Sequence, residues 1–205
     1  MKFINVRGCN GSGKTTLLRE LAKDPRCVVG RAHVTHEIKN KDKSDKAPEK
    51  IRVPHAPIPV TYCPNGIAIL GDYTPAAAGA TTAGCDRIKT QEATKLALQY
   101  IAENKGVKFV LFEGIVVSTI YGPWKEWGDA NGGMAWAFLD TPLDLCLERI
   151  QVRNGGKPVK EDQIAAKHKT IARVQEKAFN DGQTVLNLDH TKPLADLLGY
   201  MGVEL

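Results

Sequence analysis

The sequence feature that most constrains this chain is the glycine-rich segment at residues 8–15, which runs Gly-Cys-Asn-Gly-Ser-Gly-Lys-Thr. It matches G-x-x-x-x-G-K-[ST], a pattern whose glycines let backbone N–H groups wrap closely around a phosphate. The segment follows apolar residues 2–7, which suit a short buried strand, and leads into residues 15–23, which suit a helix. Because a helix N-terminus also attracts anions, the sequence predicts a phosphate site between the first strand and the first helix.

The expected phosphate-binding residues are those of this loop and its continuation: Gly8, Asn10, Gly11, Ser12, Gly13, Lys14, Thr15 and Thr16. Lys14 is expected to reach the β and γ oxygens, and Thr15 to offer its hydroxyl to Mg²⁺. The motif therefore implies ATP and Mg²⁺ as the cofactors.

Apolar segments that alternate with helical patterns indicate the fold class. Residues 109–112, 135–139 and 184–188 suit buried strands, and residues 161–179 and 193–198 suit helices. Residues 58–62 and 67–70 flank an Asn-Gly pair and predict a hairpin, whereas residues 26–57 show no regular pattern. We therefore predict a three-layer α/β fold with a mainly parallel sheet.

Length and charge suit one domain over residues 1–205, with a basic insertion at residues 31–57. The net charge of +5 allows a polyanionic partner, although the lysine-rich stretch at 39–50 is better explained as a solvated loop than as a basic arm that touches phosphates. The sequence has neither a long apolar run nor a signal peptide, which predicts a cytoplasmic protein without a membrane partner. Five scattered cysteines suggest neither a zinc site nor a disulfide framework, as expected in a reducing compartment. The composition leaves the oligomeric state open.

Among proteins with such a loop, the sequence favours a small kinase. A guanine-specific GTPase would carry N-K-x-D late in the chain, and the nearest match, at residues 40–43, is early and has Lys in place of Asp. Motor ATPases usually need a longer chain. Arg149 and Arg153 are four residues apart and precede Gly155-Gly156, so residues 149–160 resemble the short lid of nucleotide-kinase-like P-loop proteins. In such lids arginines neutralise the transferring phosphoryl group. The alternative is that both are solvated surface arginines.

Three acidic residues follow or precede regular elements. Glu113 directly follows the strand at 109–112, where a carboxylate holds Mg²⁺ or its water. Asp72 follows the second hairpin strand and is a candidate base for the acceptor hydroxyl. Asp86 is the other candidate, gripping the acceptor together with Arg87, or else it is an N-terminal acid of a helix. The sequence does not decide between Asp72 and Asp86.

Two tryptophans, Trp124 and Trp127, are expected in a loop after the Glu113 strand. On a loop beside Lys125 they are positioned to stack a base that has been turned out of a duplex. The alternative is that they pin the loop to the core.

Beyond the generic phosphate loop, this chain resembles the 5-hydroxymethyluracil DNA kinases of bacteriophages over about residues 1–155. The resemblance is carried by residues 8–16, Ile-Leu-Gly-Asp-Tyr at 69–73, Ala-Gly-Cys-Asp at 83–86, Val-Leu-Phe-Glu-Gly at 110–114, and Ser118.

The resemblance implies transfer of the γ-phosphate of ATP to the 5-hydroxymethyl group of a uracil already in double-stranded DNA. It also implies the host cytoplasm as the place of action. A kinase of free nucleosides or nucleoside monophosphates shares the loop and lid and stays open as an alternative. A DNA-binding accessory protein without catalysis is the third hypothesis, but it has no need of the acids and arginines listed above.

Overall fold

The computed structural model describes residues 1–39, 50–75, 84–88 and 90–204. Its elements in chain order are β1 (Lys2–Arg7), α1 (Lys14–Leu21), β2 (Val28–Ala32), β3 (Thr35–Lys39), β4 (Lys50–Pro54), β5 (Ile58–Cys63), η1 (Pro64–Gly66), β6 (Ile67–Leu70), η3 (Gly84–Arg87), α2 (Gln91–Ala102), β7 (Phe109–Glu113), α3 (Ile115–Thr119), α4 (Gly122–Ala130), β8 (Met134–Asp140), α5 (Leu143–Arg153), α6 (Glu161–Asn180), β9 (Thr184–Asp189) and α7 (Pro193–Met201).

The described residues form a seven-stranded sheet in the order β2-β5-β6-β7-β1-β8-β9. Strands β6, β7, β1, β8 and β9 are parallel, whereas β5 and β2 pair antiparallel at one edge. The predicted α/β fold with a mainly parallel sheet is confirmed. Since the parallel strands end at one edge, the loops after β1, β7, β8 and β9 meet there.

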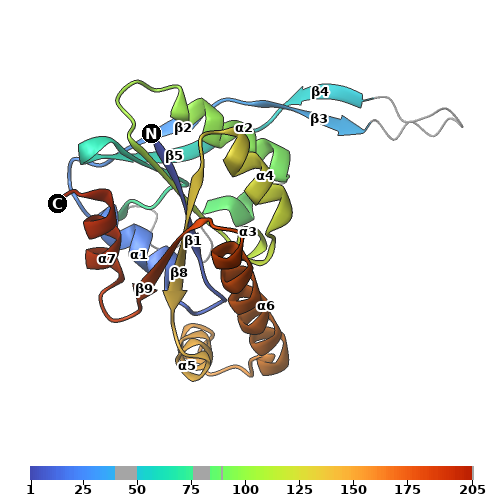
Figure 1. Ribbon diagram of the computed structural model, residues 1–205, viewed down its shortest axis with the longest axis vertical. Coiled ribbons are helices and arrows are strands. Elements are labelled where there is room, and N and C mark those ends of the chain that lie inside the picture. Colours follow the sequence, from blue (N-terminus) through green and yellow to red (C-terminus); the bar gives the residue numbers. More distant parts are fainter. Residues whose placement is uncertain (40–49, 76–83, 89, 205) are drawn as a thin grey trace, which may run out of the picture.

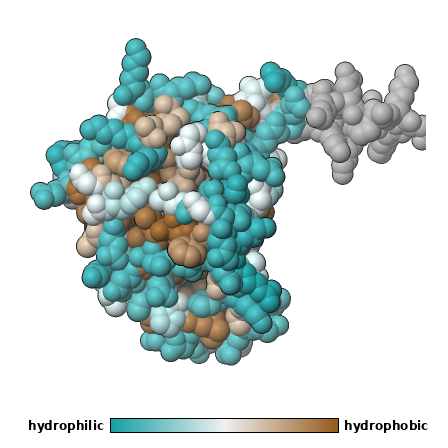
Figure 2. Space-filling model, in the orientation of Figure 1, coloured by the Kyte–Doolittle hydropathy of each residue, from teal (hydrophilic) through white to brown (hydrophobic). Residues whose placement is uncertain are grey.

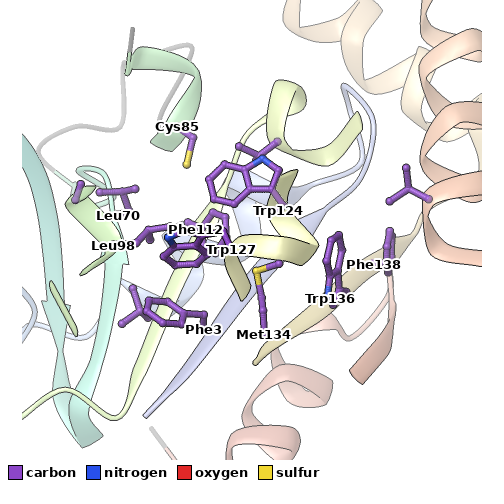
Figure 3. Packing of buried hydrophobic residues seen from close by; sticks show 14 of the residues in the cluster. Phe3, Leu70, Cys85, Leu98, Phe112, Trp124, Trp127, Met134, Trp136 and Phe138 are labelled. Carbon is purple, nitrogen blue, oxygen red and sulfur yellow. The ribbon is translucent and has the colours of Figure 1, made fainter. Parts of the chain in front are cut away.

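Helices cover both faces of the sheet (Figure 1). On one face, Leu17 and Leu18 of α1 and Leu197 of α7 pack on Ile4 and Val6 of β1. The other face carries a cluster rich in aromatic side chains from β1, β7, α4 and β8, shown in Figure 3. Both faces of β1 are therefore buried, as expected for a central strand of a parallel sheet. In Figure 2 hydrophilic residues cover most of the visible face, and hydrophobic residues gather near its centre.

The hairpin predicted around Asn65 and Gly66 is confirmed. Strand β5 pairs antiparallel with β6 through the register Cys63↔Ile67. Asn65 and Gly66 lie in the left-handed region, with φ of 63° and 76°. Asn and Gly are the residues that tolerate this conformation, which is why the pair identifies the turn.

Residues 26–57 are more regular than expected. They contain β2 at the sheet edge and a separate two-stranded antiparallel ribbon, β3–β4, which Figure 1 shows projecting beyond the helices. The expectation of irregular chain was wrong because short edge and ribbon strands carry little apolar periodicity. Most of the lysine-rich stretch, residues 40–49, lies outside the described residues.

The cysteine prediction was wrong for one pair, since Cys27 and Cys63 form a disulfide. In the antiparallel register of β2 and β5, Val28 lies opposite Tyr62, so Cys27 and Cys63 also lie opposite each other, with their Cα atoms 4.2 Å apart. They are 36 residues apart in the chain, so no local spacing indicated the pairing. Cys9, Cys85 and Cys146 are buried free thiols. None of the helices in the described part of the chain has the length and hydropathy of a membrane span.

Candidate functional site

The glycine-rich loop connects β1 to α1, as predicted, and its backbone depends on two glycines. Gly11 and Gly13 have φ of 80° and 99°, and Gly13 is the N-cap of α1. A Cβ on Gly11 would collide with the Cys146 carbonyl of α5. The loop is therefore held against α5, with its helix-starting N–H groups directed to the carboxyl edge of the sheet.

Lys14 lies inside this loop, and only 8% of its surface is exposed. Its Nζ donates to the carbonyl oxygens of Gly8 at 2.8 Å and Cys9 at 3.0 Å. Burial lowers the pKa of Lys14, and the carboxylate of Glu113 opposes that shift. An ammonium group held by loop carbonyls in this way is placed to exchange them for phosphate oxygens.

Glu113 ends β7, the strand next to β1, and only 2% of its surface is exposed. Its Oε1 accepts hydrogen bonds from Thr15 Oγ1 and from Tyr73 Oη, both at 3.0 Å. Burial raises the pKa of Glu113, whereas Lys14 and the two hydroxyl donors lower it. The structure therefore brings together the two residues predicted to hold a metal ion, Thr15 and Glu113.

The donor set of these two residues fits Mg²⁺. Both offer oxygen atoms, and Mg²⁺ in nucleotide sites is commonly bound by one or two protein oxygens together with substrate phosphates and water. The described residues contain no group of three or more His, Cys, Asp or Glu side chains that could hold a metal ion by itself. A magnesium ion here would therefore depend on the nucleotide for its remaining ligands.

The two candidate bases differ in their surroundings. Asp86 is exposed at η3, and its carboxylate accepts from the N–H of Ile115 at 2.9 Å and of Val116 at 3.3 Å. It therefore caps α3 rather than α2, whose cap is Thr90. Asp72 is half-buried, and its Oδ1 accepts from Thr74 Oγ1 at 2.7 Å in a local turn.

Most of the predicted site residues line one cavity of about 720 Å³. Its described lining combines the phosphate loop and α1 with residues of η3, β7, α3, β8, α5, the β9–α7 connection and the start of α7: Asn10, Gly11, Ser12, Gly13, Lys14, Thr15, Thr16, Leu17, Glu20, Asp86, Glu113, Ile115, Leu139, Arg149, Arg153, His190, Thr191, Lys192, Pro193, Leu194 and Ala195. Asp72 and Arg87 are not among these described lining residues.

Arg149 and Arg153 both belong to α5, one turn apart, and both line this cavity. The Nη1 atom of Arg149 lies 3.4 Å from the Gly11 carbonyl oxygen and 3.5 Å from that of Ser12. Thr141, just before α5, donates to the same Ser12 carbonyl at 2.9 Å. Both side chains are exposed, so the structure places Arg149 beside the phosphate loop and leaves both interpretations of the pair, site arginines and solvated surface arginines, as predictions.

The two tryptophans are not on a loop, so that prediction was wrong. Both belong to helix α4, where Pro123 occupies the first turn and the i, i+3 spacing directs both rings inward. Trp124 is fully buried against Phe112, and Trp127 packs edge-on against Phe3 (Figure 3). Buried rings offer no free face to a base, so the pinning alternative describes them correctly.

Sequence reasoning did not assign roles to three parts of the site. Tyr73 contacts Glu113, Cys146 contacts the phosphate loop, and residues 190–195 line part of the cavity. For residues 190–195 a signal existed, because they follow a parallel strand and so lie at the edge where ligands bind. Nothing local indicated Tyr73 or Cys146, whose contacts depend on residues 40 and 137 positions away.

Comparison with known proteins gives consistent results. The family model described as 5-hmdU DNA kinase matches residues 42–183. A 5-hmdU DNA kinase of Pseudomonas phage M6 is 62% identical over 197 residues, which is 96% of each chain. The 5-hmdU DNA kinase 1 of Salmonella phage ViI is 31% identical over 170 residues, 81% of this chain and 66% of the relative. That of Bacillus phage SP10 is 30% identical over 92% of this chain but only 27% of the relative.

Proposed function

This chain belongs to the 5-hmdU DNA kinase family and is a kinase, and on that premise we propose which phosphate it transfers and to what. The donor is the γ-phosphate of ATP, and the acceptor is the 5-hydroxymethyl oxygen of 5-hydroxymethyluracil in double-stranded DNA. In a phage-infected cell this reaction takes place in the host cytoplasm.

The observation that carries this proposal is a cavity lined together by the phosphate loop, Glu113, Asp86 and the α5 arginines. Its volume of about 720 Å³ is within the range of small-molecule sites. The loop and Lys14 bind the β and γ phosphates at one part of it. Residues 190–195, which run from the end of β9 into the first turn of α7, also line the cavity, and we assign the nucleoside of ATP to the part that they line.

The chain's own residues supply positioning and charge, which dominate phosphoryl transfer. Lys14 moves from the loop carbonyls to the phosphate oxygens, and Arg149 and Arg153 neutralise the charge that develops on the transferring group. Thr15 and Glu113 would hold Mg²⁺, which supplies further charge neutralisation when bound.

In the transfer itself, the acceptor oxygen forms a bond to the γ-phosphorus while the bond from that phosphorus to the oxygen bridging to ADP breaks. The hydroxyl proton passes to a carboxylate. Asp86 is the better placed candidate, because it lines the cavity with Lys14 and Glu113. Asp72 stays the second candidate, since it lies just before Tyr73 at the same edge of the sheet.

Charge and shape support a DNA partner. The net charge of +5 favours a polyanion. The β3–β4 ribbon extends away from the body of the molecule (Figure 1), and a two-stranded ribbon is one of the elements that a DNA groove accommodates. Arg52 of this ribbon is strongly exposed even though it pairs with Glu37 at 3.7 Å.

The test uses γ-labelled ATP and Mg²⁺ with three acceptors in parallel: duplex DNA containing 5-hydroxymethyluracil, matched thymine duplex, and the free hydroxymethylated nucleotide. We expect label in the modified duplex alone. Label in the free nucleotide but not in the duplex would contradict the proposal and support the alternative kinase of free nucleotides. Transfer from GTP but not from ATP would contradict the proposed donor.

A further inference from the structure

Tyr73 is a buried residue at the edge of the site, and a hydrogen bond from its backbone N–H to a residue of the sheet holds it in place. It follows β6 by three residues, and 1% of its surface is exposed. Its N–H donates to Thr61 Oγ1 at 3.1 Å, and the same hydroxyl donates to the Gly71 carbonyl at 2.8 Å. Thr61 is itself fully buried in β5. The position of Tyr73 is thus set by the core of the sheet rather than by the surface.

Two glycines shape the slot that its ring occupies. A Cβ on Gly71 would lie 2.7 Å from Tyr73 Cε2, and a Cβ on Gly84 would lie 2.5 Å from the Tyr73 hydroxyl. The Gly84 Cβ would also lie 2.7 Å from the backbone oxygen of Glu113. Both glycines have positive φ, of 130° and 68°. Any side chain at either position would push the phenol away from Glu113.

The hydroxyl of Tyr73 donates to Glu113 Oε1 at 3.0 Å. Burying a hydroxyl is unfavourable unless it is hydrogen-bonded, and a phenylalanine would fill the same slot without that penalty. Packing therefore explains the ring but not the oxygen atom. We therefore attribute the role of the Tyr73 hydroxyl to its hydrogen bond with Glu113.

That bond selects one orientation of the Glu113 carboxylate. The terminal torsion of a glutamate is broad, so a lone carboxylate can turn. Here Thr15 and Tyr73 both donate to Oε1, and among the described residues none donates to Oε2. The two donors come from α1 and from the segment after β6, which follow the two strands, β1 and β6, that flank β7 in the sheet. Oε2 is left as the oxygen available to a ligand.

We propose that Tyr73 is a positioning residue for Glu113, which holds the carboxylate in the orientation that binds the magnesium ion of the nucleotide complex. This inference rests on one part of the proposed function, the binding of ATP and magnesium. It requires that the site binds magnesium and ATP, and it requires nothing of the acceptor.

The test compares Tyr73→Phe with Tyr121→Phe. Tyr121 is also buried and also donates to a carboxylate, Asp181 Oδ2 at 2.7 Å, but Asp181 is not among the described residues that line the cavity, whereas Glu113 is. Binding of a non-hydrolysable ATP analogue is measured by calorimetry over a range of Mg²⁺ concentrations, together with thermal unfolding of each variant. We expect Tyr73→Phe to raise the Mg²⁺ concentration needed for half-maximal binding about tenfold, as loss of one hydrogen bond to a charged group implies. Tyr121→Phe should leave it unchanged.

A second set of variants tests whether Tyr73 acts through Glu113. In a Glu113→Gln background the effect of Tyr73→Phe on Mg²⁺ dependence should disappear, because the carboxylate it orients is gone. Equal effects in both backgrounds would overturn the inference, as would a Tyr73→Phe variant that loses thermal stability but binds magnesium and the analogue like the wild type.

The two proposals fail in different ways. If the acceptor is not modified DNA, labelled phosphate will not enter the duplex, yet the binding difference between Tyr73→Phe and Tyr121→Phe will persist. If the wild type binds the analogue equally well with and without Mg²⁺, the positioning inference is overturned even when transfer to DNA is observed.

Discussion

The Sγ atoms of Cys9 and Cys146 lie 3.3 Å apart, which joins the phosphate loop to the helix that carries Arg149 and Arg153. Both thiols are buried, and a hydrogen bond between them lets one ionise at the expense of the other. The bond from Cys146 lowers the pKa of Cys9 to about 7, whereas the pKa of Cys146 is raised by the same contact.

This pair predicts one thiolate that forms near neutral pH. The ultraviolet absorbance of thiolates should rise by the amount expected for about one thiolate per chain as the pH passes through about 7. Removing the partner thiol in Cys146→Ala should move the pKa of Cys9 up towards the ordinary thiol value, and Cys9→Ala should abolish the step. If the step survives in Cys9→Ala, the low pKa belongs to another cysteine. Cys85→Ala is the control and should leave the step in place, because burial raises the pKa of Cys85.

Lys14 is expected to be indispensable for transfer. Lys14→Ala removes the ammonium group now held by Gly8 and Cys9, and with it the charge that meets the phosphates. Loss of one such preorganised donor lowers kcat by about 10²- to 10³-fold. Steady-state turnover with the modified duplex measures the effect, and Lys23, which is exposed and pairs with Glu20, gives the control variant Lys23→Ala. Full activity in Lys14→Ala would contradict the assignment of the phosphate loop.

The choice between the two candidate bases is tested with Asp72→Asn and Asp86→Asn. We expect Asp86→Asn to lose most of its turnover while ATP binding is retained, because Asp86 lines the cavity and Asp72 does not among the described residues. Asp86 also caps α3, so its thermal unfolding is measured in parallel; loss of a cap costs about 1 kcal/mol. Loss of turnover in Asp72→Asn alone would reverse the assignment.

Trp124 is expected to contribute to stability rather than to DNA affinity. Trp124→Ala removes a fully buried indole beside Phe112 and should lower the free energy of unfolding by about 3–5 kcal/mol. Denaturant unfolding measures this loss, and DNA binding is compared at a temperature where the variant is folded. Weaker DNA binding with unchanged stability would restore the stacking hypothesis.

Local patterns in the sequence were sufficient to predict the phosphate loop and the strand that ends at Glu113. In both cases the signal is contiguous: a glycine pattern between a strand and a helix, and an acid directly after an apolar run. Their proximity also followed from the fold, because the carboxyl ends of parallel strands meet at one edge. The 3.0 Å contact between Thr15 and Glu113 is the result of that rule.

Other features could not be predicted because they depend on pairing between distant segments. The disulfide of Cys27 and Cys63 requires the register of β2 on β5, and the Cys9–Cys146 contact requires the docking of α5 on the loop. Trp124 and Trp127 were misplaced for a different reason. Both were expected in a loop after the Glu113 strand, yet the i, i+3 spacing of the rings is also that of a buried helix face, which is the outcome here.

The two arginines of α5 should differ in importance. Arg149 Nη1 lies within 3.5 Å of the phosphate-loop carbonyls, whereas no such contact joins Arg153 to the described part of the loop. A guanidinium beside the phosphate loop is expected to stabilise the charge of a transferring phosphoryl group more than one a turn further along the helix. We therefore expect Arg149→Gln to lower kcat about 10²-fold and Arg153→Gln to have a smaller effect, while the KM for ATP changes less than kcat in both. Arg173→Gln on the exposed face of α6 is the control, and equal turnover of Arg149→Gln and Arg173→Gln would show that α5 lines the cavity without taking part in transfer.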